Sequence, residues 1–246
     1  MKKNIILDVD PGVDDSVSMI YSFLSNRLDV KLICVTKGNK DLKQSTLNAL
    51  FITEKYSKTP VPIVKGAKEP LKKTQIQTLN VHGASGLGSI INVTSVSSKP
   101  VNRRGYGASE AILECVRQNK NIIYLCNGPA TTLAKALKKY PEIATHLHSI
   151  VLMSGSIDGK GGGISPYASF NAFSDPDALA LVLKCGVPIT FSPSEIGLSV
   201  YLTPEILQRF GLHGKYGKAI RDLCTGYHDL RLPADKYATH DLCAVM

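Results

Sequence analysis

Short apolar runs alternate along this chain with segments of helical periodicity. The apolar runs predict strands at residues 4–8, 30–36, 62–65, 122–126, 150–154 and 188–191. Between these runs, apolar side chains recur at intervals of three and four residues, as in Val17, Ile20, Tyr21 and Leu24. Strands that alternate with amphipathic helices are typical of βαβ units, so we expect an α/β fold with a mainly parallel central sheet flanked by helices.

Two stretches interrupt this alternation. Residues 72–104 are rich in Ser, Thr, Asn and Gly, and residues 157–174 contain consecutive glycines at 161–163. We expect both stretches to be long loops over the sheet edge, and loops of this length are more often functional than idle. Separately, α/β sheets bind their ligands at the carboxyl ends of the strands, so polar residues directly after each strand are candidate site residues. No internal repeat and no linker divides the chain, so we expect residues 1–246 to form a single domain.

The amino-acid composition indicates a globular protein. Hydrophobic residues make up 43% of the 246 residues and charged residues 20%, which is typical of a globular protein with a substantial core. The 29 Lys and Arg exceed the 20 Asp and Glu, but they are scattered, which favours a solvated basic surface over a nucleic-acid-binding stripe. The apolar run at residues 5–7 is too short for a signal peptide or membrane span, so we expect no membrane partner and a cytoplasmic protein.

Four aspartates, Asp8, Asp10, Asp14 and Asp15, lie within eight residues directly behind the first predicted strand. Like charges packed into one turn repel one another unless a cation neutralises them or some of them stay protonated. A hard divalent cation held by carboxylate oxygens is the natural occupant. The alternative is that Asp14 or Asp15 caps the following helix, but capping explains only one or two of the carboxylates.

The aspartate motif resembles the amino-terminal signature of the nucleoside hydrolases, calcium-dependent enzymes that cleave the N-glycosidic bond of ribonucleosides. Further motifs of this family follow in the same order, at residues 38–39, 82–88, 127–132, 170–176 and 240–245. The resemblance implies a Rossmann-like fold, a small-molecule nucleoside as substrate in nucleoside salvage, and a homo-oligomer, either a dimer or a tetramer. Because the basic residues are scattered, we expect no nucleic-acid partner.

The resemblance also implies roles for individual residues. The calcium ligands that it implies are Asp10, Asp15, the main-chain carbonyl of Cys126, and Asp241. Such an all-oxygen set suits calcium, which accepts six to eight oxygen ligands. Asp14 matches the general base that takes a proton from the attacking water, close to a transition state that resembles an oxocarbenium ion. We expect Asp8 to support the other aspartates through hydrogen bonds.

Histidines and asparagines complete the site that the resemblance implies. His82 and His240 match positions that give a proton or a hydrogen bond to the departing base, and His240 has the stronger claim because it adjoins Asp241. For His82, the alternative is a loop histidine that stabilises a glycine-rich turn. Asn39 and Asn171 match positions whose amides bond the ribose hydroxyls, although an asparagine after a strand often only forms a turn.

The sequence departs from the family pattern at the sugar-binding positions. Ser169 stands where the family has a glutamate that bonds the outer hydroxyls of the sugar, and Gly163 stands where it has an asparagine that reaches the 5′-hydroxyl. The chain also stops at Met246, five residues after Asp241, so we expect either a truncated form or a neighbouring chain at this face. We therefore expect complete machinery for metal binding and attack, but weakened binding of plain ribose.

Two other functions stand beside hydrolysis. An Asp-x-Asp pair after a strand also opens the haloacid-dehalogenase-type phosphatases, but that function leaves Asp14, Asp15, His82 and the His-Asp pair at 240–241 unexplained. The other alternative is a calcium-containing, nucleoside-binding relative that has lost turnover through its changed sugar clamp. Release of free base from a panel of nucleosides separates these functions.

Overall fold

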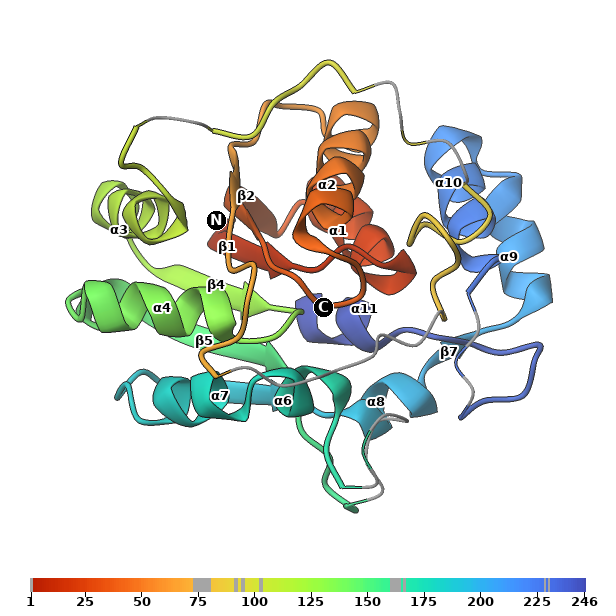
Figure 1. The fold of residues 1–246 in the computed structure, drawn as a ribbon. Coiled ribbons are helices and arrows are strands. Elements are labelled where there is room, and N and C mark those ends of the chain that lie inside the picture. Colours follow the sequence, from red (N-terminus) through yellow and green to blue (C-terminus); the bar gives the residue numbers. More distant parts are fainter. Residues whose placement is uncertain are drawn as a thin grey trace.

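The computed structural model describes residues 2–72, 81–90, 93, 96–101, 104–159, 165, 167–227, 229 and 231–246. A six-stranded parallel sheet of order β3-β2-β1-β4-β5-β6 runs through its centre, with helices on both faces (Figure 1). The strands are β1 (Lys3–Val9), β2 (Leu28–Val35), β3 (Ile63–Lys65), β4 (Ile122–Cys126), β5 (Leu147–Met153) and β6 (Ile189–Ser192). The predicted α/β class and all six predicted strands are confirmed.

Two hydrophobic cores cover the two faces of the sheet. Along β1, Ile5, Leu7 and Val9 belong to one core, and Ile6 belongs to the other. The first core packs against α1 (Val13–Leu24), α2 (Leu42–Tyr56), α9 (Pro204–Gly211), α10 (Gly214–Cys224) and α11 (His240–Val245). The second packs against α3 (Ala108–Gln118), α4 (Thr131–Lys139), α5 (Ile143–His146) and α7 (Pro176–Leu183). Burial on both faces explains why the strands are continuous apolar runs.

The strand order places a binding crevice at the carboxyl ends of β1 and β4. From β1 the chain moves outward to β2 and β3, and it then returns to the other side of β1 to form β4, β5 and β6. The loops that follow β1 and β4 therefore leave the sheet in opposite directions, and α/β sheets bind ligands at such a switch point. Asp10 follows β1 there, and Asn127 follows β4.

The structure corrects one predicted loop. Residues 157–174 are not loop throughout, because α6 (Phe170–Ser174) begins within them. Gly163 lies outside the described residues. The structure also adds α8 (Ser194–Ser199) and a small antiparallel pair, β7 (Tyr201–Leu202) and β8 (Tyr237–Ala238), which the apolar pattern did not indicate.

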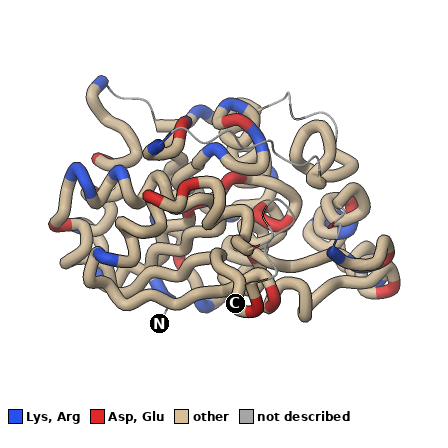
Figure 2. Tube along the Cα trace, turned by 60° about the horizontal axis from the view of Figure 1, so that its bottom comes forward, with Lys and Arg blue, Asp and Glu red and all other residues tan. Residues whose placement is uncertain are grey.

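The surface agrees with the scattered basic residues of the sequence. Lys and Arg positions are spread over many elements around the outside of the chain (Figure 2). None of the helices within the described ranges is both long enough and apolar enough to cross a membrane.

Candidate active site

The turn between β1 and α1 gathers the amino-terminal aspartates. Gly12 is the N-cap of α1, and the carboxylate of Asp15 accepts hydrogen bonds from the main-chain N–H of Gly12 at 3.1 Å and of Asp10 at 3.2 Å. Asp15 therefore does cap the helix, as the simpler alternative predicted. Capping leaves the carboxylates of Asp10 and Asp14 to be explained.

The other end of the chain adds a further carboxylate to this turn. Asp241 lies in the first turn of α11, and its carboxyl group is in hydrogen-bond contact with that of Asp15. Carboxylate oxygens of Asp14, Asp15 and Asp241 lie within 4.8 Å of one another. Two carboxyl groups in contact require a shared proton or a cation between them. We call Asp10, Asp14, Asp15 and Asp241 the acidic cluster.

Asp10 lies beside the other three members of the acidic cluster. Its Oδ2 atom accepts a hydrogen bond of 2.7 Å from the main-chain N–H of Asn39. Asp10 is not one of the three residues whose oxygens lie within 4.8 Å of one another, although its charge acts on both Asp15 and Asp241. Cys126 ends β4 at the same edge, and its thiol donates to the carbonyl oxygen of Gly128 at 3.2 Å.

Burial makes the acidic cluster costly to ionise. Desolvation and the charge of Asp15 raise the pKa of Asp14 to about 8. The same two causes raise the pKa of Asp10 well above its usual range, and burial with the charge of Asp14 does so for Asp241. The Lys and Arg ion pairs found in the described parts of the chain all involve other carboxylates. A divalent cation fits this set, because carboxylate oxygens are hard ligands that lack a counter-charge here.

Asp8 lies on the opposite face of the sheet. Its Oδ2 atom accepts a hydrogen bond of 2.8 Å from the hydroxyl of Tyr124, and its main-chain oxygen accepts one from the N–H of Asn127. Burial raises the pKa of the Asp8 carboxyl to about 8. The hydrogen bonds of Asp8 thus join β1 to the end of β4. Among the described residues none of them reaches another aspartate, so the expected hydrogen-bond support of the other aspartates is not found.

His82 faces the start of α1. Its Nδ1 atom accepts a hydrogen bond of 3.2 Å from the main-chain N–H of Val13 and lies 3.8 Å from Oδ1 of Asp14. Burial lowers the pKa of His82 to about 3, so the ring is neutral, and the bond to Nδ1 assigns its proton to Nε2. The ring stacks on Tyr227, with 5.1 Å between centroids. A Cβ atom at Gly12 would lie 2.6 Å from Nδ1, so glycine permits this close approach.

His240 is held by two residues that sequence reasoning missed. Its Nε2 atom lies 3.0 Å from Oδ2 of Asp229 and 2.9 Å from Nη2 of Arg231. Its Nδ1 atom is buried and has no hydrogen-bond partner among the described residues. A Cβ atom at Gly197 would lie 2.1 Å from this Nδ1, so α8 packs directly against the ring. In this conformation both ring nitrogens face protein groups.

The two asparagines lie at the same edge of the sheet. The amide nitrogen of Asn39 donates to Oδ2 of Asp15 at 3.1 Å, which places Asn39 against the acidic cluster. The amide nitrogen of Asn171 donates to the main-chain oxygens of Asn127 and Met153, at the ends of β4 and β5. Contact of either amide with a sugar stays a prediction.

Ser169 is the N-cap of α6. Its hydroxyl oxygen accepts hydrogen bonds from the main-chain N–H of Ala172 at 3.4 Å and of Gly155 at 2.8 Å. Because both acceptor positions of the hydroxyl are used, only its proton remains for another partner. Serine before a helix is a capping signal, but the preceding glycine run favoured a loop.

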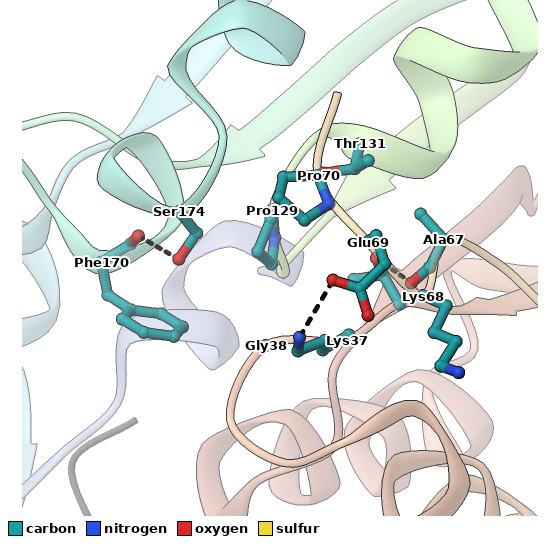
Figure 3. A pocket seen from close by; sticks show the side chains of 11 residues that line it. Lys37, Gly38, Ala67, Lys68, Glu69, Pro70, Pro129, Thr131, Phe170 and Ser174 are labelled. Atoms are coloured by element: carbon teal, nitrogen blue, oxygen red, sulfur yellow. Dashed lines mark hydrogen bonds and ion pairs between the residues drawn. The ribbon is translucent and has the colours of Figure 1, made fainter. Parts of the chain in front are cut away.

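A hollow lies beside the acidic cluster, at the carboxyl ends of β2 and β3 (Figure 3). Its lining includes Lys37, Gly38 and Glu69 on one side and Phe170 of α6 on the other. Lys37 pairs with Glu69 at 3.4 Å. A Cβ atom at Gly38 would lie 1.8 Å from Oδ2 of Asp10, so the hollow shares a wall with the cluster.

Comparison with known proteins identifies related chains. The family model for inosine-uridine preferring nucleoside hydrolases matches residues 5–246. The non-specific ribonucleoside hydrolase RihC of Salmonella paratyphi B is 30% identical over 242 residues, which are 98% of this chain and 77% of the relative. The purine-preferring ribonucleoside hydrolase from Gardnerella vaginalis has a TM-score of 0.90 and 29% identity over 99% of this chain and 78% of its own. The plant nucleoside hydrolase PpNRh1 has a TM-score of 0.89 and 27% identity, covering 100% of this chain and 78% of its own.

Proposed function

The chain belongs to the inosine-uridine-preferring nucleoside hydrolase family, and from this premise we propose that it hydrolyses the N-glycosidic bond of ribonucleosides with the help of bound Ca²⁺. The observation that carries the proposal is the acidic cluster. Its buried carboxylates come from both ends of the chain and lack a pairing Lys or Arg within the described residues. Such a cluster is stable at neutral pH only with an added cation.

Three side chains and one main-chain group are the proposed calcium ligands. They are Asp10, Asp15, Asp241 and the carbonyl of Cys126, all at the carboxyl edge of β1 and β4. Oxygen donors of this kind match the preference of calcium. When bound, the ion polarises the attacking water and orients the ribose hydroxyls.

Asp14 is the proposed general base. Its Oδ1 atom is buried and has no hydrogen-bond partner among the described residues, so it is free to accept a proton from water. Burial and the charge of Asp15 raise its pKa to about 8 without a cation, and a bound cation would favour the ionised carboxylate that a general base needs. After the proton moves to Oδ1, the remaining carboxylates of the cluster favour the cationic sugar of the transition state.

The other site residues have proposed contacts with the base and the sugar. His82 presents its Nε2 proton as a donor to the departing base, and His240 is a second candidate for that role. Asn39, Asn171 and Ser169 are the proposed partners of the ribose hydroxyls. Because Ser169 has only its proton left to donate, we expect weaker sugar binding than a glutamate would provide. We also infer from the resemblance a cytoplasmic homo-oligomer.

One assay tests the proposed function. The calcium-loaded protein is incubated with purine and pyrimidine ribonucleosides, and free base is quantified by chromatography, with Asp14→Asn as the inactive control. Base release that a chelator abolishes and added calcium restores supports the proposal. Calcium and nucleoside binding without release of base identifies a non-catalytic relative, and phosphate release from sugar phosphates identifies a phosphatase.

A further inference from the structure

Asp229 holds Arg231 in a single orientation. Nε and Nη2 of the guanidinium donate to the two carboxylate oxygens of Asp229, at 2.9 and 2.7 Å. The main-chain N–H of Arg231 also donates to Asp229 at 2.9 Å, and the carboxylate is buried. A fork held through two parallel hydrogen bonds fixes the direction of its remaining nitrogen.

That remaining nitrogen, Nη1 of Arg231, is buried without a partner. Among the described residues it has no hydrogen-bond acceptor. A buried charged donor is expensive to leave unpaired, and such a group at a functional site points to a ligand. Arg221 shows the contrast, because it pairs with Asp222 at 2.7 Å on the surface, where its side chain is 42% exposed.

Arg231 lies beside the reacting groups. Its Nη2 atom lies 2.9 Å from Nε2 of His240, and His240 directly precedes Asp241 of the acidic cluster in α11. Tyr227 stacks on His82, which contacts the first turn of α1. The guanidinium is therefore a fixed positive charge in contact with His240, next to the acidic cluster.

In this geometry His240 cannot donate a hydrogen bond to the base that departs. Nε2 of His240 already faces Asp229 and Arg231, and Nδ1 is packed against Gly197. When the C1′–N bond breaks, its electron pair leaves with the base. A hydrogen-bond donor directed at the base must stabilise that charge as it develops.

We propose that Arg231 is a catalytic residue that binds the departing base through Nη1, next to the glycosidic nitrogen, and that it acts beside the hydrogen bond from His82 to stabilise the base as an anion. This role rests on the proposed function. As the C1′–N bond breaks, its electron pair leaves with the base, water adds to the cationic C1′ and gives its proton to Asp14, and the base departs as an anion that later takes a proton from solvent. The acceptor that Nη1 meets is O2 of a pyrimidine or N3 of a purine. Asp229 acts through Arg231 as a positioning residue.

The test compares two leaving groups in the calcium-loaded enzyme. Uridine releases a base that needs stabilisation, whereas a nitrophenyl riboside releases a phenolate that is already a good leaving group. We expect Arg231→Met to lower kcat/KM for uridine by about 100-fold, as for loss of one transition-state donor, and to change kcat/KM for the nitrophenyl riboside by less than about threefold. Arg231→Lys, which keeps the charge without the fork, should lose about tenfold on uridine alone.

A chemical deletion gives a second measurement. Adenosine and 3-deazaadenosine differ in the N3 acceptor, so removal of N3 should lower kcat/KM in the wild type and have little further effect in Arg231→Met. Arg221→Met is the matched control and should leave both substrate pairs within about twofold, as for other surface changes. Asp229→Asn should show the same leaving-group dependence as Arg231→Met, to a smaller extent.

The outcomes separate this role from the proposed function. Equal losses on uridine and the nitrophenyl riboside in Arg231→Met and Arg231→Lys, with unchanged melting temperatures, overturn the role of Arg231. Leaving-group dependence in His240→Ala but in neither Arg231 variant also overturns it and returns the role to His240. If the wild type releases neither base nor nitrophenolate while calcium is bound, the proposed function itself fails, and the role of Arg231 fails with it.

Discussion

The acidic cluster and the buried carboxylate of Asp229, which contacts His240 next to Asp241, are in opposite electrostatic states. In the acidic cluster, burial and mutual repulsion raise the pKa of Asp10, Asp14 and Asp241. Burial would also raise the pKa of Asp229, but hydrogen bonds from His240 and Arg231 hold it well below its usual range. Burial alone therefore does not decide the charge of a carboxylate. What decides it is whether the chain supplies a positive partner.

This difference separates a site that binds an external ligand, the acidic cluster, from a carboxylate that orients another side chain, Asp229. The carboxylates of the acidic cluster have no positive partner among the described residues, so a divalent cation can compensate their charge, and we propose that this cation is calcium. Asp229 is already compensated, so it orients Arg231 and gains nothing from an added ion. Substitutions in the acidic cluster should therefore affect catalysis and metal binding. Substitution of Asp229 should instead change how strongly the rate depends on the leaving group.

The largest effect is expected for Asp14→Asn. This change removes the proposed base and keeps the shape, so kcat should fall by about 10² to 10⁴-fold, while the melting temperature with calcium stays close to that of the wild type. Steady-state kinetics and thermal unfolding measure the two quantities. Asp29→Asn is the control, because Asp29 forms a surface ion pair with Lys31. Turnover near the wild-type value would show that the base is another residue.

Calcium removal is the next test of the comparison. A ligand that binds only the folded state at 100 times its Kd stabilises it by about 2.7 kcal/mol, so a chelator should lower the melting temperature by several degrees. Asp241→Asn should remove most of this calcium-dependent increment, and Asp229→Asn should retain it. Metal analysis with thermal melts at fixed protein concentration checks both. A melting temperature that ignores the chelator, in protein that contains no calcium, contradicts the calcium assignment.

In the calcium-free protein, the acidic cluster should make stability depend on pH. The pKa of Asp14 is raised to about 8 in the folded state, so folded protein binds a proton that unfolded protein lacks between about pH 4 and 8. Stability should therefore rise by about 1–2 kcal/mol as the pH falls from 8 to 6.5. From about pH 7.5 downward the lowered pKa values of His82 and His240 oppose part of the gain, because unfolded histidines take up protons near pH 6.5 while the folded ones stay neutral.

Urea unfolding in the presence of a chelator measures this dependence. Asp229 cannot contribute between pH 8 and 6.5, because its lowered pKa affects stability only near and below pH 4. Asp229→Asn is therefore the control and should keep the slope, whereas Asp14→Asn should reduce it. A stability that is flat, or that falls, on going from pH 8 to 6.5 would contradict the raised pKa of the cluster.

Most of the acidic cluster could be predicted from the sequence, whereas the contact of Asp229 and Arg231 with His240 could not. The aspartates after β1 occupy one contiguous turn behind a buried strand, so their proximity follows from local structure. Asp241 was identified only by its motif. Asp229 and Arg231 lie between α10 and β8, where no apolar period indicates a face, and their contact with His240 depends on how that segment packs. Hydrophobic periodicity fixes elements and faces, and it is silent on irregular segments.

The smallest effect is expected at Ser169, where capping and sugar contact can be separated. Ser169→Ala removes the acceptor that caps α6 and should cost about 1 kcal/mol of stability. Ser169→Asp restores an acceptor for the main-chain N–H groups of Gly155 and Ala172, so it should regain most of that loss.

Both variants lack the hydroxyl proton that remains for the ribose. Because a lost hydrogen bond costs about 0.5–1.5 kcal/mol, both should lower kcat/KM for uridine by about two- to tenfold. Ser199→Ala, on the surface of α8, is the control for both measurements. If Ser169→Asp recovers kcat/KM together with stability, the hydroxyl only caps the helix, and the ribose is held by the asparagines without it.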